Sequence, residues 1–264
     1  MSLRKRFLWL ILCFLLASSH DALAVRNEEL PSVTVLADNS LTLPLTLIAR
    51  EFARERDVMI SVAFASAIEQ LEDIEDGNPA NVLITAQPGS IDQLKAQGLA
   101  DVYSQSIVAR NELVLVTRKE HPVQFQFAEG TSLNDALEPL GKYYYFVAAD
   151  PTFLELGIFS SEIIDHYGWD KELGTHFVFP NDLPSMHELI AERPHAGLLY
   201  MSEAKRNHDL RIIDTVPQET YSPVQYEAIV VAGEYMNTAR NFIEYLNSPA
   251  AQKVFADMGF EVAQ

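Results

Sequence analysis

Cysteine and basic side chains are both scarce in this chain. Cys13 is the only cysteine among 264 residues, so no internal disulfide can form. Lys and Arg number 19 against 37 Asp and Glu, which gives a formal net charge of −18. Such an excess of negative charge opposes binding to nucleic acid or to an anionic membrane surface. We therefore expect neither as a partner.

Motifs of catalysis and of cation binding are also missing. The sequence contains no Gly-x-Ser-x-Gly elbow, no phosphate-binding P-loop and no Gly-x-Gly-x-x-Gly fingerprint. Six histidines follow the N-terminal leader, and none has the spacing of a zinc motif: His121, His166, His176, His187, His195 and His208. No set of nucleophile, base and orienting residue is visible. We therefore expect no enzyme, no cofactor and no bound metal cation.

The N-terminus has the pattern of a secretory signal. Three basic residues, 4–6, precede an apolar run over 7–17 that is too short to form a stable membrane anchor. Ala22-Leu23-Ala24 is typical of a cleavage site. We expect residues 1–24 to be removed as a signal peptide, Cys13 with them, which places the mature chain in the periplasm. An uncleaved N-terminal anchor is the alternative.

Strands and helices alternate along the first third of the chain. Strands are expected at 32–36, 58–64, 82–85 and 112–117, and helices at 43–56, through 68–74 and at 91–96. The run Val82–Thr85 is continuously apolar, as in strands buried on both faces. This order predicts a parallel sheet with helices on both faces.

The alternation then restarts, which predicts a second α/β lobe. Strands are expected at 142–148, 177–179, 196–200, 211–214 and 225–231, and helices at 132–140, 156–167, 183–192, 202–207, 237–246 and 250–258. The long apolar strands near 112–117 and 225–231 are where the chain could cross between lobes. We expect one lobe to comprise residues 31–110 with 228–264, and the other to comprise residues 111–227.

The stretch Val33–Thr42 predicts an anion site. It is a buried strand that runs through a Ser/Thr-rich turn into an amphipathic helix. Free backbone N–H groups at the positive end of a helix bind anions. Ser40 could instead be a simple helix cap, a role that uses the same geometry. Because the chain is strongly acidic, fixed local donors rather than bulk charge would have to hold an anion.

Four stretches carry a resemblance to a known family: Val33–Thr42, Ala63–Ala67, Gly77–Gln87 and Ala196–Ala204. The ending Asn247–Phe255 with Gly259-Phe260 adds to it. In order and spacing over nearly the whole mature chain, these stretches resemble the periplasmic molybdate-binding proteins. That family comprises solute-binding components of ABC importers.

The resemblance implies a two-lobed periplasmic-binding-protein fold of type II, each lobe a mostly parallel sheet flanked by helices, with the ligand between lobes. It implies a monomer that captures molybdate or tungstate and hands it to an ABC permease in the inner membrane. No cofactor is implied. The ligand donors carried over by position are Ser40, Ala67, Ala86, Leu156, Leu183 and Tyr200, with Asn39 and Ser66 as further donors.

Several positions depart from the family pattern. Ala67 stands where a second serine is usual, and Leu156 is bulkier than its counterpart. Asp38, two residues before Ser40, would repel a bound dianion unless it turns away or pairs with a cation. The alternatives are therefore another oxyanion, a small organic solute whose amine pairs with Asp38, or an envelope sensor built on the same fold.

Overall fold

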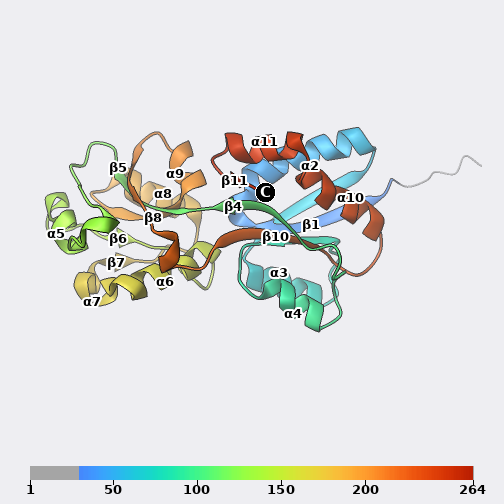
Figure 1. Ribbon diagram of the computed structural model, residues 1–264, viewed down its shortest axis with the longest axis horizontal. Coiled ribbons are helices and arrows are strands. Elements are labelled where there is room, and N and C mark those ends of the chain that lie inside the picture. The colour runs from blue at the N-terminus through green and yellow to red at the C-terminus, as the bar shows by residue number, and fades with distance from the viewer. Residues whose placement is uncertain (1–29, 264) are drawn as a thin grey trace, which may run out of the picture. The chain divides into compact units, whose positions relative to one another are not determined.

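The computed structural model describes residues 30–263, so the predicted signal peptide over 1–24 lies outside the described part. Two β-sheets organise the chain (Figure 1). The first has the strand order β11 (Glu261–Val262), β4 (Ser106–Asn111), β10 (Val224–Val230), β3 (Val82–Thr85), β1 (Ser32–Asp38) and β2 (Met59–Ala65). The second has the order β7 (Phe177–Val178), β6 (Phe146–Val147), β8 (Ala196–Tyr200), β5 (Leu113–Arg118) and β9 (Leu210–Thr215).

Strand β1 lies inside the first sheet and is buried on both faces. It pairs in parallel with β2 and β3, as the alternation of strands and helices predicts. Val33, Val35 and Ala37 belong to one apolar cluster and Leu36 to another, because successive side chains of a strand point to opposite faces. One face is covered by α2 (Thr42–Arg56), α10 (Met236–Leu246) and α11 (Pro249–Asp257), the other by α3 (Ala67–Glu75) and α4 (Ser90–Ala96) (Figure 1).

Both sheets contain antiparallel pairs that the sequence pattern did not reveal. In the first sheet β10 runs antiparallel to β3 and β4. In the second sheet β5 is antiparallel to β8 and β9, whereas β6 is parallel to β7 and β8. The accompanying helices are α5 (Leu133–Leu137), α6 (Glu155–Tyr167), α7 (Trp169–Leu173), α8 (Leu183–Glu192) and α9 (Met201–Arg206). Short 3-10 turns occur at η1 (Asn39–Leu41), η2 (Phe127–Glu129), η3 (Glu138–Leu140), η4 (Gly174–His176) and η5 (Gln218–Thr220).

The chain passes twice between the sheets. It leaves the first sheet at Glu112, between β4 and β5, and returns between β9 and β10. Strand β10 begins at Val224, before the predicted lobe boundary at residue 228. The exact lobe boundaries stay a prediction.

Some predicted elements are shorter than expected. The strand predicted over 142–148 is reduced to β6, because Gly141 turns the chain at φ 88° and Tyr143 is exposed. The helix predicted over 132–140 stops at Leu137 and continues as the 3-10 turn η3, which contains Pro139. Strand β4 was not predicted, because its polar ends at Ser106 and Asn111 obscure an apolar centre.

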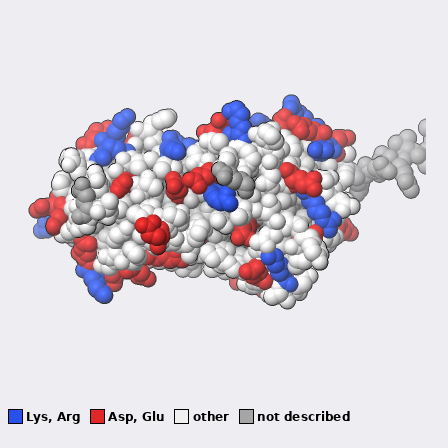
Figure 2. Space-filling model, in the orientation of Figure 1, with Lys and Arg blue, Asp and Glu red and all other residues white. Residues whose placement is uncertain are grey.

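Charged side chains are scattered over the surface. On the face drawn in Figure 2, acidic and basic groups are interspersed and do not gather into one basic patch. Within residues 30–263 no helix is long and apolar enough to cross a membrane. In the same range no group of three or more His, Cys, Asp or Glu side chains could hold a metal ion.

Candidate ligand-binding site

The turn after β1 directs two side chains inward. Asp38 caps η1: its Oδ1 accepts hydrogen bonds from the backbone N–H of Ser40 and from Ser40 Oγ, both at 2.7 Å. Asp38 and Ser40 are each 2% exposed. Asp38 therefore does not turn away from the predicted site. It takes up both donors of Ser40, and within the described residues no Lys or Arg forms an ion pair with it.

A hydroxyl from β10 contacts the same turn. Tyr226 Oη lies 2.7 Å from Ser40 Oγ, and Asn111 Nδ2 of β4 donates to Tyr226 Oη at 3.4 Å. Asn111 Nδ2 also donates to Ser202 Oγ of α9 at 2.8 Å. Tyr226 is fully buried. The two strands next to the chain crossings thus hold the Ser40 turn through polar contacts.

A carboxyl from α6 occupies the N-terminus of α3. The Ala67 backbone N–H, at the first residue of α3, donates to Glu155 Oε1 at 2.6 Å. Glu155 is 3% exposed although it begins its own helix. Ser66 is occupied separately, because it caps α3 in a reciprocal capping box with Glu69. The Glu155 carboxyl therefore lies at the N-terminus of α3, where the positive end of the helix dipole attracts anions.

A close backbone approach sets the position of Glu155. Gly157 lies in the first turn of α6, and a Cβ added there would come within 2.4 Å of Pro151 N and 2.6 Å of Asp150 C. The absent side chain lets the preceding loop pack against the helix start. The Gly157 N–H also donates to the Leu154 carbonyl at 2.9 Å. These contacts direct the first residue of α6 toward α3.

The carboxyls of Asp38 and Glu155 lie close enough for each to shift the pKa of the other. Burial raises the pKa of Glu155 well above its usual value, and the negative charge of Asp38 raises it further. Burial also raises the pKa of Asp38, whereas the two Ser40 donors lower it. Two neighbouring buried carboxyls repel each other when both are ionised, so one of them favours the protonated form. We assign that proton to Glu155, because the Ser40 donors favour the ionised form of Asp38.

Tyr200 completes the buried group from the second sheet. It is the last residue of β8, is 1% exposed, and its Oη has no hydrogen-bond partner among the described residues. Burial raises the pKa of Tyr200 well above 10, and the nearby charges of Asp38 and Glu155 are among the further causes. The hydroxyl therefore stays protonated. A buried hydroxyl without a partner costs about 1–3 kcal/mol, which a ligand oxygen would offset.

The arrangement described so far combines neutral donors with two buried carboxyls, and it is built on helix starts and strand ends. The model of the family described as bacterial extracellular solute-binding protein matches residues 33–261. The chain belongs to this family.

Relatives of this solute-binding protein share its length and fold. It is 29% identical over 234 residues to the molybdate-binding protein ModA of Escherichia coli K12, which covers 87% of this chain and 89% of that protein. The periplasmic molybdate-binding protein of Azotobacter vinelandii superimposes with a TM-score of 0.72 at 18% identity, over 88% and 100% of the chains. A substrate-binding domain of a putative molybdenum ABC transporter from Clostridium difficile gives 0.72 at 19% identity, over 88% and 99%.

These comparisons confirm three predictions. The resemblance to molybdate-binding proteins holds, and the fold is that of a type II periplasmic binding protein. The chain is a solute-binding protein of a transporter family and not an enzyme. The two relatives from Escherichia coli and Azotobacter vinelandii are molybdate-binding proteins.

The other predicted donors of this solute-binding protein make no described hydrogen bond to Asp38 and Glu155, which we call the acid pair. Leu156 is buried and follows Glu155 in α6. Leu183 begins α8, where Asp182 caps the helix by accepting from Ser185 N. Asn39 is half-buried in η1, and its carbonyl accepts from Thr42 Oγ1. No direct contact joins these three to the Asp38 and Glu155 carboxyls among the described hydrogen bonds.

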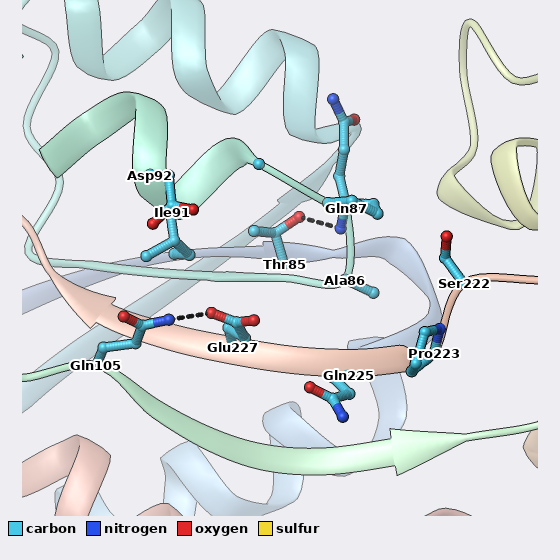
Figure 3. A pocket seen from close by; sticks show the side chains of 12 residues that line it. Thr85, Ala86, Gln87, Ile91, Asp92, Gln105, Ser222, Pro223, Gln225 and Glu227 are labelled. Atoms are coloured by element: carbon cyan, nitrogen blue, oxygen red, sulfur yellow. Dashed lines mark hydrogen bonds between the residues drawn. The ribbon is translucent and has the colours of Figure 1, made fainter. Parts of the chain in front are cut away.

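Ala86 lines a separate cavity of about 310 Å³ between β3, α4 and β10 (Figure 3). Gln105 and Glu227 are hydrogen-bonded to each other on its wall, and Thr85 Oγ1 accepts from Gln87 N at 3.0 Å. The lining residues include neither Ser40, Ala67 nor Tyr200. Ala86 is therefore not brought to the Asp38 and Glu155 carboxyls.

Sequence reasoning missed three residues of this region: Glu155, Asn111 and Tyr226. A glutamate in the first turn of a helix is ordinarily read as a solvated charge that suits the helix dipole. Tyr226 and Asn111 lie in strands, and nothing local marks their polar atoms as functional. The contact that reveals Glu155 joins residues 88 positions apart.

Proposed function

We propose that this protein is a periplasmic solute-binding protein that captures a small oxyanion and delivers it to an ABC permease in the inner membrane. Its predicted signal peptide would direct export. Molybdate and tungstate are the first ligands to test, because the relatives named above are molybdate-binding proteins. A monomer remains the expected state.

The observation that carries the proposal is the hydrogen bond from the Ala67 amide to Glu155. Ala67 is one of the donors carried over from the family, and it holds an oxygen group at the start of α3. The unpartnered hydroxyl of Tyr200, another of those donors, lies in the same buried region. Neutral donors of this kind hold an anion reversibly in a chain of net charge −18.

Ligand entry requires the buried donors to become accessible. Ser40, Ala67 and Tyr200 are each at most 2% exposed. We propose that α3 and α6 separate by movement of two lobes, residues 31–110 with 228–264 and residues 111–227, about the two chain crossings. Closure around the ligand then expels water and strengthens each hydrogen bond.

Thermal unfolding with a panel of anions tests the function. The chain without its signal peptide is heated with molybdate, tungstate, sulfate or phosphate. A ligand at a hundred times its Kd stabilises the folded state by about 2.7 kcal/mol, so the Tm should rise with its concentration. Ser40→Ala should reduce the rise, because it removes the hydroxyl between Asp38 and Tyr226.

Ser132→Ala is the matched control, since it also removes a hydrogen-bonded hydroxyl, here the N-cap of α5, but lies outside the site. It should leave the ligand-induced rise unchanged. The absence of any shift at millimolar concentrations of all four anions would refute oxyanion binding.

A second candidate function is binding of an organic solute that carries an amine, which the buried carboxyl of Asp38 favours. A Tm rise with amines and none with oxyanions would support it. Neighbouring genes separate transport from an envelope sensor: permease and ATPase genes indicate transport, whereas a kinase or cyclase gene indicates sensing.

A further inference from the structure

The carboxyl of Glu155 shows what the site accepts. One of its oxygens accepts a hydrogen bond from the Ala67 amide at 2.6 Å. Asp38 lies close enough to this carboxyl for each to shift the pKa of the other. Its Oδ1 receives both donors of Ser40, and its buried Oδ2 has no hydrogen-bond partner among the described residues. The region therefore suits an oxygen acid that accepts from the Ala67 amide on one side and donates an O–H to Asp38 Oδ2 on the other.

We infer that the ligand replaces this carboxyl and must itself carry a proton: an oxyanion of the phosphate type, which donates one O–H to Asp38 and accepts from the Ala67 amide. This inference rests on the proposed oxyanion-binding function and narrows its ligand. Sulfate and molybdate carry no proton at neutral pH, so they would place an oxygen lone pair against the carboxylate of Asp38.

The hydrogen bonds around Asp38 suit its carboxylate to accept an O–H from the ligand. Its two hydrogen bonds from Ser40 hold the carboxylate in one orientation. Another acid of the region, Glu203, forms an ion pair with Arg206 and a hydrogen bond with His187. Within the described residues no cation offsets the charge of Asp38, so a proton from the ligand is the remaining means of satisfying it.

Glu155 can leave without disturbing a helix interior, because it is the first residue of α6. Rotation of its side chain would free the Ala67 amide and the acceptor oxygen of Asp38 together. The Tyr200 hydroxyl, which has no hydrogen-bond partner among the described residues, would then donate to a further oxygen of the ligand. Glu155 thus competes with the ligand for the Ala67 amide. Asp38 determines whether a protonated or a fully deprotonated anion binds.

Calorimetric titrations near neutral pH with phosphate, sulfate and molybdate test the inference. The intact mature chain should bind phosphate at least about ten- to a hundredfold more tightly than either fully deprotonated anion, the value of one hydrogen bond to a charged group. Asp38→Asn should reverse this preference by a similar factor, because the new amide donates where the carboxylate accepted. Glu155→Ala should tighten phosphate binding and keep the preference.

Asp214→Asn is the control, since Asp214 also accepts from two backbone N–H groups, those of Phe127 and Thr215, but lies on β9 outside the site. It should behave as the unaltered chain. Tight binding of molybdate or sulfate over phosphate, unchanged by Asp38→Asn, would overturn the inference and leave the oxyanion function standing. Binding of no anion by the chain or by any variant would refute both.

Discussion

At the scale of single residues, the Asp38 and Glu155 pair couples the structure to pH. The folded-state pKa of Glu155 lies above that of an exposed glutamate, 4.5, so the folded state prefers the protonated side chain. The contribution of Glu155 to the free energy of unfolding is therefore fully present below pH 4.5. It is lost as the pH rises toward the folded-state pKa. The acidic and phenolic groups around it are Asp38, Glu203, Tyr200 and Tyr226.

We therefore predict that Glu155→Gln changes the pH profile of stability. Glutamine keeps a donor for Asp38 and an acceptor for Ala67, and it cannot ionise. As the pH rises above 4.5, the ordinary pKa of glutamate, the unaltered chain should lose up to about 1.4 kcal/mol per pH unit relative to the variant. Urea unfolding across this range measures the difference. Parallel profiles of the two proteins would contradict the protonated pair.

Glu162→Gln provides the matched control. Glu162 lies on the same helix, and its carboxylate accepts from Ser222 N, but it is outside the acid pair. Its variant should retain the pH profile of the unaltered chain.

The same residues show what local sequence can predict. Ser40 was predicted because a strand that enters a helix through small polar residues leaves free N–H groups, a local rule, whereas Ala67 came only from the resemblance to a family. The sequence also showed that Asp38 would repel a dianion. It did not show that the carboxyl of Glu155 lies beside Asp38. That contact depends on the three-dimensional fold and has no periodicity to reveal it.

At the scale of secondary-structure elements, the start of α6 is the most constrained feature near the site. Gly157→Ala would place a methyl group against the backbone of Asp150 and Pro151, which cannot rotate away. We predict a loss of about 1–3 kcal/mol in the free energy of unfolding, as for other overpacked sites. Displacement of the helix start should also weaken the pH dependence attributed to Glu155.

Gly233→Ala controls for the change of residue type. A Cβ at Gly233 meets nothing within 4 Å, so its effect on unfolding should be small. Equal effects of the two substitutions in urea unfolding would show that the close approach at Gly157 is not required.

Most elements could be predicted because their apolar spacing is strong, as in α8, whose bounds Leu183–Glu192 match those predicted. The failures have physical causes. Strand β6 is short because the aromatic run before it lies in an exposed turn, although aromatic residues favour strands. The antiparallel direction of β10 was also missed. The alternation of strands and helices does not indicate the direction of a strand that enters the first sheet from the second.

At the scale of the whole molecule, the two sheets contribute different halves of one site. The first sheet supplies the Asp38 and Ser40 turn and the start of α3, and the second is followed by α6 and supplies Tyr200. The buried hydrogen bond from the Ala67 amide to Glu155 joins them. In the function that we propose, oxyanion binding by this acidic chain depends on a few fixed donors rather than on its overall charge of −18.

A crystal structure of the mature chain with the oxyanion that raises its Tm most tests this account directly. We predict the anion within hydrogen-bond distance of the Ala67 amide and the Tyr200 hydroxyl, with the Glu155 carboxyl rotated out of that position. An anion bound elsewhere while Glu155 still accepts from Ala67 would contradict it.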